Sequence, residues 1–178
     1  IPPEALRHTL ADGVKKASEG IGKGSGQYAM HAGGQELPMH DGRFDPGFAL
    51  HYAVEPTPGR HTIGSQMYYE MYRLWKRVKG LHQPWLMYRK KSKYKATEKK
   101  AVEAAACSKF TNVLNGAGAC VFGAQIGVDR VPIFEWLNAA TGWNKTPNEY
   151  MDIGVRLQTM KQAFNIKHGV DPKSYRPN

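Results

Sequence analysis

The chain is poor in cysteine and in acidic side chains, and it has no long apolar run. Two cysteines, Cys107 and Cys120, occur in 178 residues, which is too few for a disulfide framework and typical of a reducing compartment. No apolar stretch approaches the roughly 20 residues that span a bilayer, and no signal-peptide pattern opens the sequence. We therefore expect a cytoplasmic protein without membrane contact.

Several motifs of common metal and nucleotide sites are also absent. The sequence contains no CxxC, no HExxH and no Walker-type GxxxxGK[ST] pattern. With two cysteines the chain cannot assemble a complete cysteine-ligated metal site by itself. A glycine-rich stretch from Gly20 to Gly26 follows a predicted helix rather than a strand, which favours a helix end and loop over a phosphate cradle. The first residue is Ile1 rather than Met, so we expect a piece of a longer protein.

The apolar residues that are present recur at helical spacing. Hydrophobic residues make up 41% of the chain, enough for one domain or two small ones with a real core. No convincing pair of alternating strands is found, so we predict an all-α, multihelical architecture. The short apolar run from Phe48 to Val54 fits either a helix or a strand. The predicted helical stretches are residues 3–19, 68–78, 97–114 and 132–140, and one that begins at Pro147.

The last of these helices has the strongest start signal. Thr146, Pro147, Asn148 and Glu149 form a capping box with proline in the first helical position. Gly169 is the expected end of this helix. The residues predicted to form its core face are spaced by three and four: Tyr150, Ile153, Leu157, Met160 and Phe164.

Two irregular segments precede the middle of the chain. Residues 31–47 form a long segment without helical spacing, and such segments in compact domains are often functional. Pro56, Pro58 and Gly59 then predict a constrained turn that presents Arg60 and His61.

Basic residues are concentrated between Lys79 and Lys100. Eight lysines and arginines lie there against one acidic residue, Glu98, and aromatic side chains are interleaved. Cations and rings together are typical of nucleic-acid surfaces. No recognised nucleic-acid-binding motif accompanies them, so a solvated insertion or a docking surface for an acidic partner is the favoured interpretation.

The segment Asn115 to Phe122 places a thiol directly after a helix. Gly116 and Gly118 interrupt the helical run, and Cys120 follows on the turn. Exposed backbone groups beside a thiol suit a polar cofactor. A buried structural cysteine beside a helix end is the alternative.

Several short motifs resemble motifs of the tungsten-dependent aldehyde ferredoxin oxidoreductase family, and they follow one another in the family's order. Residues 34–43 and 47–53 resemble the family's KG-x-E-L-P-x-x-D-P-R … G-x-x-L-x-Y-A passage, residues 59–61 its R-G-A-x-H turn, and residues 115–120 its D-x-x-G-L-C motif. Thr141-Gly142-Trp143, Gly154-x-Arg156 and Phe164-Asn165-x-x-x-Gly169 resemble its C-terminal helices.

The resemblance implies the C-terminal part of a cytoplasmic redox enzyme. Such enzymes hold tungsten or molybdenum between two pterin dithiolenes beside a [4Fe–4S] cluster, oxidise aldehydes to carboxylates and pass the electrons to ferredoxin. Three cluster cysteines lie upstream in the family, and no such triplet occurs here. Both cofactors would therefore need the rest of the polypeptide. The sequence leaves the oligomeric state open, with a homo-oligomer as one alternative, whereas nucleic acid is not expected as a partner.

The resemblance also assigns site residues. It implies that Cys120 is the fourth cluster ligand, that Asn115 and the backbone of Ala119 contact pterin, and that His61 acts near the metal as proton donor or carbonyl orienter. The sequence departs from the family with Asn115 for Asp, Ala119 for Leu and Gly42 for Pro. Such departures suggest a divergent branch, and one branch of the superfamily reduces aromatic acyl-CoA esters.

The implied domain organisation has three parts. Residues 1–78 would close the family's middle helical domain and carry active-site loops, residues 79–96 would be a basic linker or insertion, and residues 97–178 would form the C-terminal helical domain. Two other classes remain as alternatives: a basic helical nucleic-acid-binding module, and a stand-alone helical interaction domain.

Overall fold

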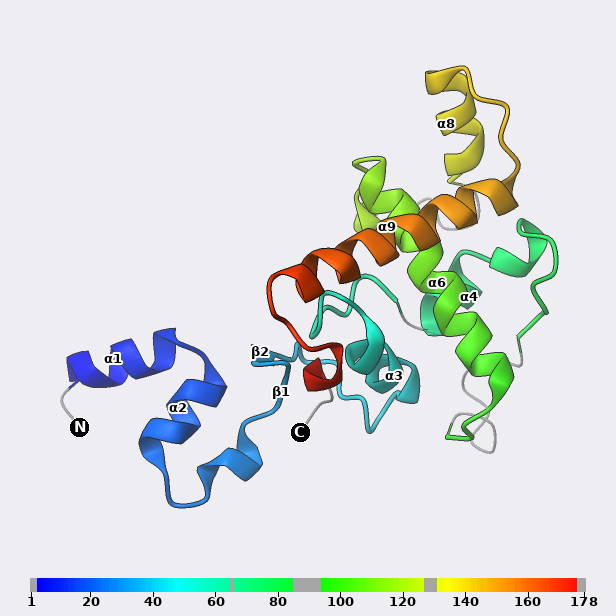
Figure 1. Cartoon of the computed structure of the whole chain (residues 1–178). Coiled ribbons are helices and arrows are strands. Elements are labelled where there is room, and N and C mark those ends of the chain that lie inside the picture. The colour runs from blue at the N-terminus through cyan, green and yellow to red at the C-terminus, as the bar shows by residue number, and fades with distance from the viewer. Residues whose placement is uncertain (1–2, 65, 85–93, 127–130, 176–178) are drawn as a thin grey trace.

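The computed structural model describes residues 3–64, 66–84, 94–126 and 131–175. The described part is mainly helical, which confirms the predicted fold class, with one small two-stranded sheet. In Figure 1 an N-terminal arm stands away from a body in which α6 and α9 cross. None of the helices in the described part combines the length and apolar character that a bilayer crossing requires. Part of the basic segment, residues 85–93, lies outside the described residues.

The arm and the hairpin come first along the chain. The predicted helix over residues 3–19 is wrong in its middle, because Gly13 adopts a left-handed φ of 89° and divides it in two. The sequence prediction also missed a short hairpin, in which His31 pairs with Glu36 and Ala32 with Gln35. The elements of this region are α1 (Pro3–Ala11), α2 (Val14–Ile21), the 3-10 turn η1 (Ser25–Tyr28), β1 (His31–Ala32) and β2 (Gln35–Glu36).

The body begins with α3 (Pro46–Val54), so the ambiguous apolar run is a helix. The Asp45 side chain accepts a hydrogen bond from the Gly47 N–H and starts that helix, with Pro46 in its first turn. The predicted helix over residues 68–78 is interrupted, because Arg73 has a φ of 46°. It forms α4 (Gln66–Met71) and the 3-10 turn η2 (Leu74–Lys76).

The central helix of the body is α6 (Glu98–Gly116), which Thr97 caps. It runs two residues beyond the predicted end at Leu114. Phe110 and Leu114 are fully buried in the main hydrophobic core. The Phe110 ring meets Tyr72 from the α4 side and Phe134 of α8. The remaining elements are α7 (Val121–Ile126), α8 (Ile133–Thr141), α9 (Pro147–Lys167) and the 3-10 turn η3 (Pro172–Tyr175).

The helix α9 crosses α6 at Gly154. A Cβ added at Gly154 would collide with the backbone carbonyl of Lys109, so only glycine permits this approach. Because the buried stretch of α9 centres on the crossing, its buried residues are Tyr150, Met151 and Gly154. The predicted core face is therefore wrong in its second half, where Met160 and Phe164 are exposed.

Candidate functional site

The turn after α3 presents His61. The backbone of Gly59 has a φ of 72°, and a Cβ there would lie 2.8 Å from the carbonyl oxygen of Glu36. Glycine is thus required both for the left-handed backbone and for the close approach of β2. On the far side, the Asn165 side chain of α9 donates to the Pro56 carbonyl at 2.7 Å. The predicted turn is present and is held from two sides.

His61 is half-buried and lies against a second histidine. The centroids of the His40 and His61 rings are 4.5 Å apart, and His40 also stacks on Phe48. Burial, the neighbouring His40 and the charge of Arg60 together lower the pKa of His61 below its usual value. His61 is therefore a neutral imidazole at pH 7, in a form that accepts a proton.

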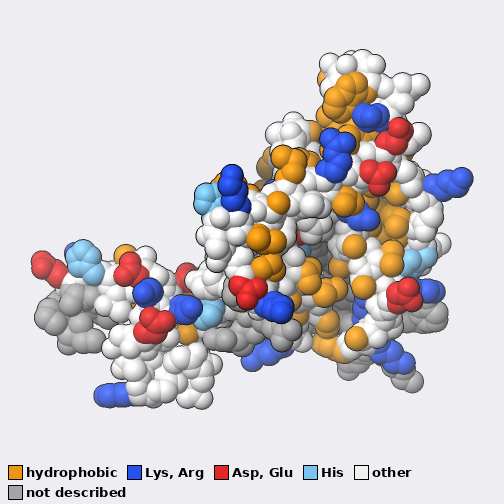
Figure 2. Space-filling view, in the orientation of Figure 1, with side chains coloured by type: hydrophobic (Ala, Val, Ile, Leu, Met, Phe, Trp, Pro, Cys, Tyr) orange, Lys and Arg blue, Asp and Glu red, His pale blue; other side chains and the backbone are white. Residues whose placement is uncertain are grey.

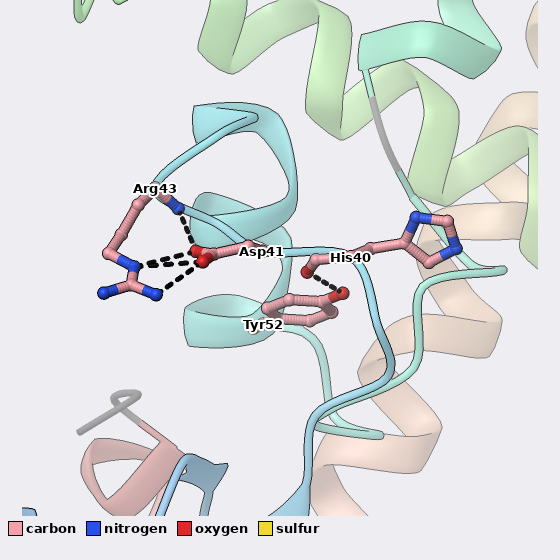
Figure 3. Close-up of polar contacts among 4 residues, drawn as sticks. All are labelled: His40, Asp41, Arg43 and Tyr52. Atoms are coloured by element: carbon pink, nitrogen blue, oxygen red, sulfur yellow. Dashed lines mark hydrogen bonds and ion pairs between the residues drawn. The ribbon is translucent and has the colours of Figure 1, made fainter. Parts of the chain in front are cut away.

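A cavity of about 360 Å³ adjoins this histidine pair. Its wall includes Leu37, His40 and Tyr52. The Tyr52 hydroxyl donates to the His40 carbonyl at 3.0 Å and fixes that backbone (Figure 3). Figure 3 also shows the Arg43 guanidinium folded back on the Asp41 carboxylate, to which it donates at 2.6–3.0 Å. The motif at residues 34–43 thus forms most of the wall of a cavity that His40 lines.

Beneath the turn lies a buried polar pair, His51 and Glu55. The His51 Nε2 lies 2.8 Å from the Arg60 carbonyl oxygen, and its Nδ1 lies 3.8 Å from Glu55 Oε2. Burial lowers the pKa of His51 to about 4 and raises the pKa of Glu55, so both side chains favour their neutral forms. The pair joins the end of α3 to the residue that precedes His61.

Two helices of the C-terminal half hold Glu55 in place. The Ser108 hydroxyl of α6 donates to Glu55 Oε2 at 2.7 Å, and the Gln158 amide of α9 donates to the same oxygen at 3.3 Å. The Asn112 amide donates to the Ser108 carbonyl, and its Oδ1 accepts from Lys161 Nζ at 2.6 Å. The sequence analysis missed His40, His51 and Glu55 as parts of this site. The only signal was their spacing around the turn, and that spacing does not reveal burial.

The second predicted site follows the C-terminal end of α6. The helix ends with the Ala117 N–H donating to the Val113 carbonyl, and Gly118 follows with a φ of 74°. The Ala119 N–H donates to the Leu114 carbonyl at 2.9 Å. Of the two backbone groups of Ala119, the carbonyl oxygen is therefore the one left for a ligand. Asn115 is exposed on this turn.

The two cysteines differ in accessibility. Cys107 is fully buried in the core, whereas Cys120 is exposed just before α7. Within the described residues, no three His, Cys, Asp or Glu side chains gather closely enough to hold a metal ion. Cys120 is therefore a single accessible thiol, and the described part supplies no further cysteine beside it.

The surface of the body differs from that of the arm. Figure 2 shows hydrophobic side chains gathered over the body, whereas the arm shows mostly polar and charged ones. The exposed large hydrophobic residues of the C-terminal half include Phe122, Trp136, Trp143, Met160 and Phe164. A concentration of exposed apolar side chains of this kind is typical of an interface.

Comparison with known proteins gives a consistent result. A family model described as aldehyde ferredoxin oxidoreductase, domains 2 and 3, matches residues 3–178. The tungsten-containing aldehyde ferredoxin oxidoreductase of Pyrococcus horikoshii is 29% identical over 170 residues, which are 95% of this chain and 25% of that protein. Its counterpart in Thermococcus kodakarensis is 26% identical over 170 residues, with 94% and 26% covered. The chain spans about a quarter of the length of these relatives.

Proposed function

The chain belongs to the aldehyde ferredoxin oxidoreductase family, and from this premise we propose that it forms domains 2 and 3 of a tungsten-containing oxidoreductase. In the proposed reaction an aldehyde and water become a carboxylate, and an electron pair and protons leave. The electrons pass through a [4Fe–4S] cluster to ferredoxin or a similar carrier. The observation that carries the proposal is the match of a single family over residues 3–178. The basic segment lies inside that match.

His61 is the group that we assign to proton transfer. It lies on a turn held by Gly59 and by the Asn165 contact, as a positioned catalytic group must be held. Its lowered pKa keeps the imidazole neutral, so it accepts a proton from water or from a hydrated aldehyde. The cavity lined by His40, whose ring contacts the His61 ring, offers space for a small substrate.

Cys120 fits the role of one cluster ligand. Iron–sulfur clusters of the [4Fe–4S] type are held by cysteine thiolates, and an exposed thiol on a fixed turn suits that role. The other ligands must come from the rest of the polypeptide. The same holds for the tungsten or molybdenum group, which supplies the two-electron redox chemistry when bound. On this side Asn115 and the Ala119 carbonyl are the groups assigned to pterin, since an amide offers both donor and acceptor edges.

The exposed apolar surface of the body supports an extensive internal interface. We propose that the remainder of the same polypeptide packs on this surface, because the relatives are about four times as long as this chain. A homo-oligomer is a further proposed association. The basic residues near Lys79 suit an acidic electron carrier.

The test of the proposed function uses the complete polypeptide that carries this chain. It is purified without oxygen, and its tungsten, molybdenum and iron are measured by inductively coupled plasma mass spectrometry. Aldehyde oxidation is followed with a viologen dye as electron acceptor. A metal-loaded protein that oxidises no aldehyde and reduces no acyl-CoA ester would contradict the proposal.

A further inference from the structure

The buried pair under the His61 turn is not part of the motifs that define the family resemblance. The family passage leaves the position of His51 open, and Glu55 lies between that passage and the turn motif. Yet His51 is 3% exposed and Glu55 is fully buried. Burying two ionisable side chains is costly unless they make compensating contacts. Their contacts therefore indicate what the pair does.

The geometry determines the tautomer of His51. Its Nε2 faces the Arg60 carbonyl at 2.8 Å, and a carbonyl oxygen only accepts hydrogen bonds, so the ring proton is on Nε2. In the neutral ring Nδ1 then carries a lone pair, and it faces Glu55 Oε2 at 3.8 Å. The ring therefore lies between the Glu55 carboxyl and the backbone carbonyl that immediately precedes His61, and it is hydrogen-bonded to the carbonyl.

The space for this ring depends on Gly64. A Cβ on Gly64 would lie 2.7 Å from His51 Nδ1 and 3.1 Å from its Cε1, which is closer than atoms pack. The backbone of Gly64 is not left-handed, so this glycine is needed for space rather than for conformation. The chain after the turn thus closes over the Nδ1 edge of the ring.

Glu55 is itself tied to the rest of the body. Its Oε2 accepts hydrogen bonds from Ser108 of α6 and Gln158 of α9, while Oε1 has no hydrogen-bond partner in the described part of the chain. A buried carboxyl with one unsatisfied oxygen stabilises the fold poorly. A role in orienting its neighbour gives a reason for such an acid at this place.

We propose that His51, packed between Glu55 and Gly64, is a positioning residue that sets the direction of the His61 imidazole through the Arg60 carbonyl. This inference deepens the proposed function and rests on it, because it assigns His61 a task that needs a fixed direction. A displacement of about 1 Å in a catalytic group is enough to lower a rate by roughly 10²-fold. His51 itself touches no reacting atom.

The first test compares two amides at position 51 in the complete polypeptide. The Nε2 of glutamine in His51→Gln lies where the His51 Nε2 lies and still donates to the Arg60 carbonyl. The shorter asparagine in His51→Asn does not reach it. With metal content unchanged, we expect His51→Asn to lower kcat by about 10- to 100-fold without a change in KM. His51→Gln should keep most of the wild-type kcat.

Hydrogen–deuterium exchange supplies a readout that does not depend on activity. In His51→Asn the amides of residues 57–64 should exchange faster, while those of α6 and α9 should not change. In His51→Gln the turn should keep its protection. Unchanged exchange of the turn in His51→Asn would overturn the positioning role, whatever the activity.

A second variant acts on the same contact without removing a polar group. Gly64→Ala should displace the ring from its position against the Arg60 carbonyl and lower kcat by about tenfold. In a His51→Ala background the added methyl group meets no ring, so the second substitution should lower kcat no further. Equal effects of Gly64→Ala in both backgrounds would contradict the inference, even if His51→Asn failed to fold.

The outcomes also separate the two levels of the proposal. A looser turn together with a lower kcat supports the positioning role. A looser turn with full activity overturns the positioning role and leaves the role of His61 to its own test. If His61→Ala remains fully active, the proposed function of His61 fails independently of His51.

Discussion

The turn that carries His61 and the turn that carries Cys120 lie on the same fold but are built differently. The His61 turn is contacted from β2, α3, α6 and α9, directly or through Glu55. The Cys120 turn is held by the backbone hydrogen bonds of its own helix end, and its thiol is exposed. The first turn is complete within this chain, whereas the second presents a group outward.

The difference matches the proposed chemistry of each group. A proton-transferring imidazole needs a fixed direction and a controlled pKa, and this chain supplies both from its own residues. A cluster ligand has its final geometry set by the iron atoms and by the other ligands. The Cys120 turn is therefore expected to reach its final structure only with the rest of the polypeptide.

The largest expected effect concerns Cys120. In the complete polypeptide, Cys120→Ser should lose or destabilise the cluster, because a hydroxyl oxygen is a poorer ligand for iron than a thiolate. Cys107→Ser is the matched control, since Cys107 is buried in the core away from the turn. Iron content measured by mass spectrometry should fall in the first variant only. Equal iron in both would remove Cys120 from the cluster.

The same comparison predicts that the chain alone holds no stable [4Fe–4S] cluster. Cys120 offers a single accessible thiolate, and the other cysteine is fully buried. Anaerobic reconstitution of the 178-residue chain should leave iron far below four atoms per chain, by the requirement for about four thiolates. A stoichiometric cluster with its characteristic absorbance would show that this turn needs no partner.

The next effect concerns His61. His61→Ala in the complete polypeptide should lower kcat by roughly 10²-fold or more with metal content intact, the usual scale for a general acid–base group. His168→Ala is the control, because His168 is exposed at the end of α9 and packs on Phe164. Because the pKa of His61 is lowered, the acid limb of kcat/KM should lie below pH 6.5 and vanish in the variant. Equal rates in both variants would exclude His61 from the chemistry.

The sequence predicted most of the helices and both turns, because their signals are local. The capping box is confirmed, with the Thr146 N–H donating to Glu149 Oε2 at 2.7 Å and the Glu149 N–H donating to the Thr146 hydroxyl. The turn at Gly59 follows from prolines and glycine in the same way. Periodicity failed where a backbone crossing decided burial, as at Gly154, which leaves Met160 and Phe164 exposed.

The network around Glu55 was beyond prediction for a different reason. Ser108 and Gln158 lie 53 and 103 residues from Glu55 along the chain, and nothing in a single sequence pairs them. Their hydrogen bonds exist only once α3, α6 and α9 have packed. The assigned roles of Asn115, Ala119 and Cys120 stay predictions that the experiments above address.

The crossing of α6 and α9 positions the two helices whose side chains hold Glu55 beneath the His61 turn. Gly154→Ala should destabilise the chain by about 3 kcal/mol, because the added methyl group collides with the Lys109 carbonyl. Gly20→Ala is the control, since its Cβ would meet only a side-chain carbon of Thr9 at 3.5 Å. Urea unfolding measures both. A Gly154→Ala chain as stable as wild type would show that the crossing is loose.

The buried pair predicts a pH dependence that the exposed Cys120 turn does not share. The pKa of His51 is about 4 in the fold, against 6.5 for a histidine in an unfolded chain. The unfolded state binds more protons between those values, so this contribution is present above pH 6.5 and is lost as the pH falls towards 4. Relative to His51→Gln, the wild type should lose about 2 kcal/mol of unfolding free energy between about pH 7.5 and 4.5. A difference that does not vary with pH would contradict a neutral buried His51.

The smallest expected effect tests whether α9 transmits a local change to the His61 turn. Thr146→Ala removes the side chain that accepts from the Glu149 N–H and donates to its carboxylate, and it should destabilise the chain by about 1 kcal/mol. Thr159→Ala is the matched control, because the Thr159 hydroxyl bonds only to the Val155 carbonyl within the helix. Thermal unfolding should therefore shift by about 2–4 °C in the first variant and hardly in the second.

Hydrogen exchange then locates the effect. Gln158 and Lys161, which reach the buried network, lie about three and about four turns of helix beyond Thr146. Because a helix end frays within its first turn, the amides that follow Thr146 should exchange faster while residues 57–64 keep their protection. If the turn at His61 also exchanges faster, α9 moves as one rigid body. The start of α9 and the His61 turn are then coupled more tightly than their contacts indicate.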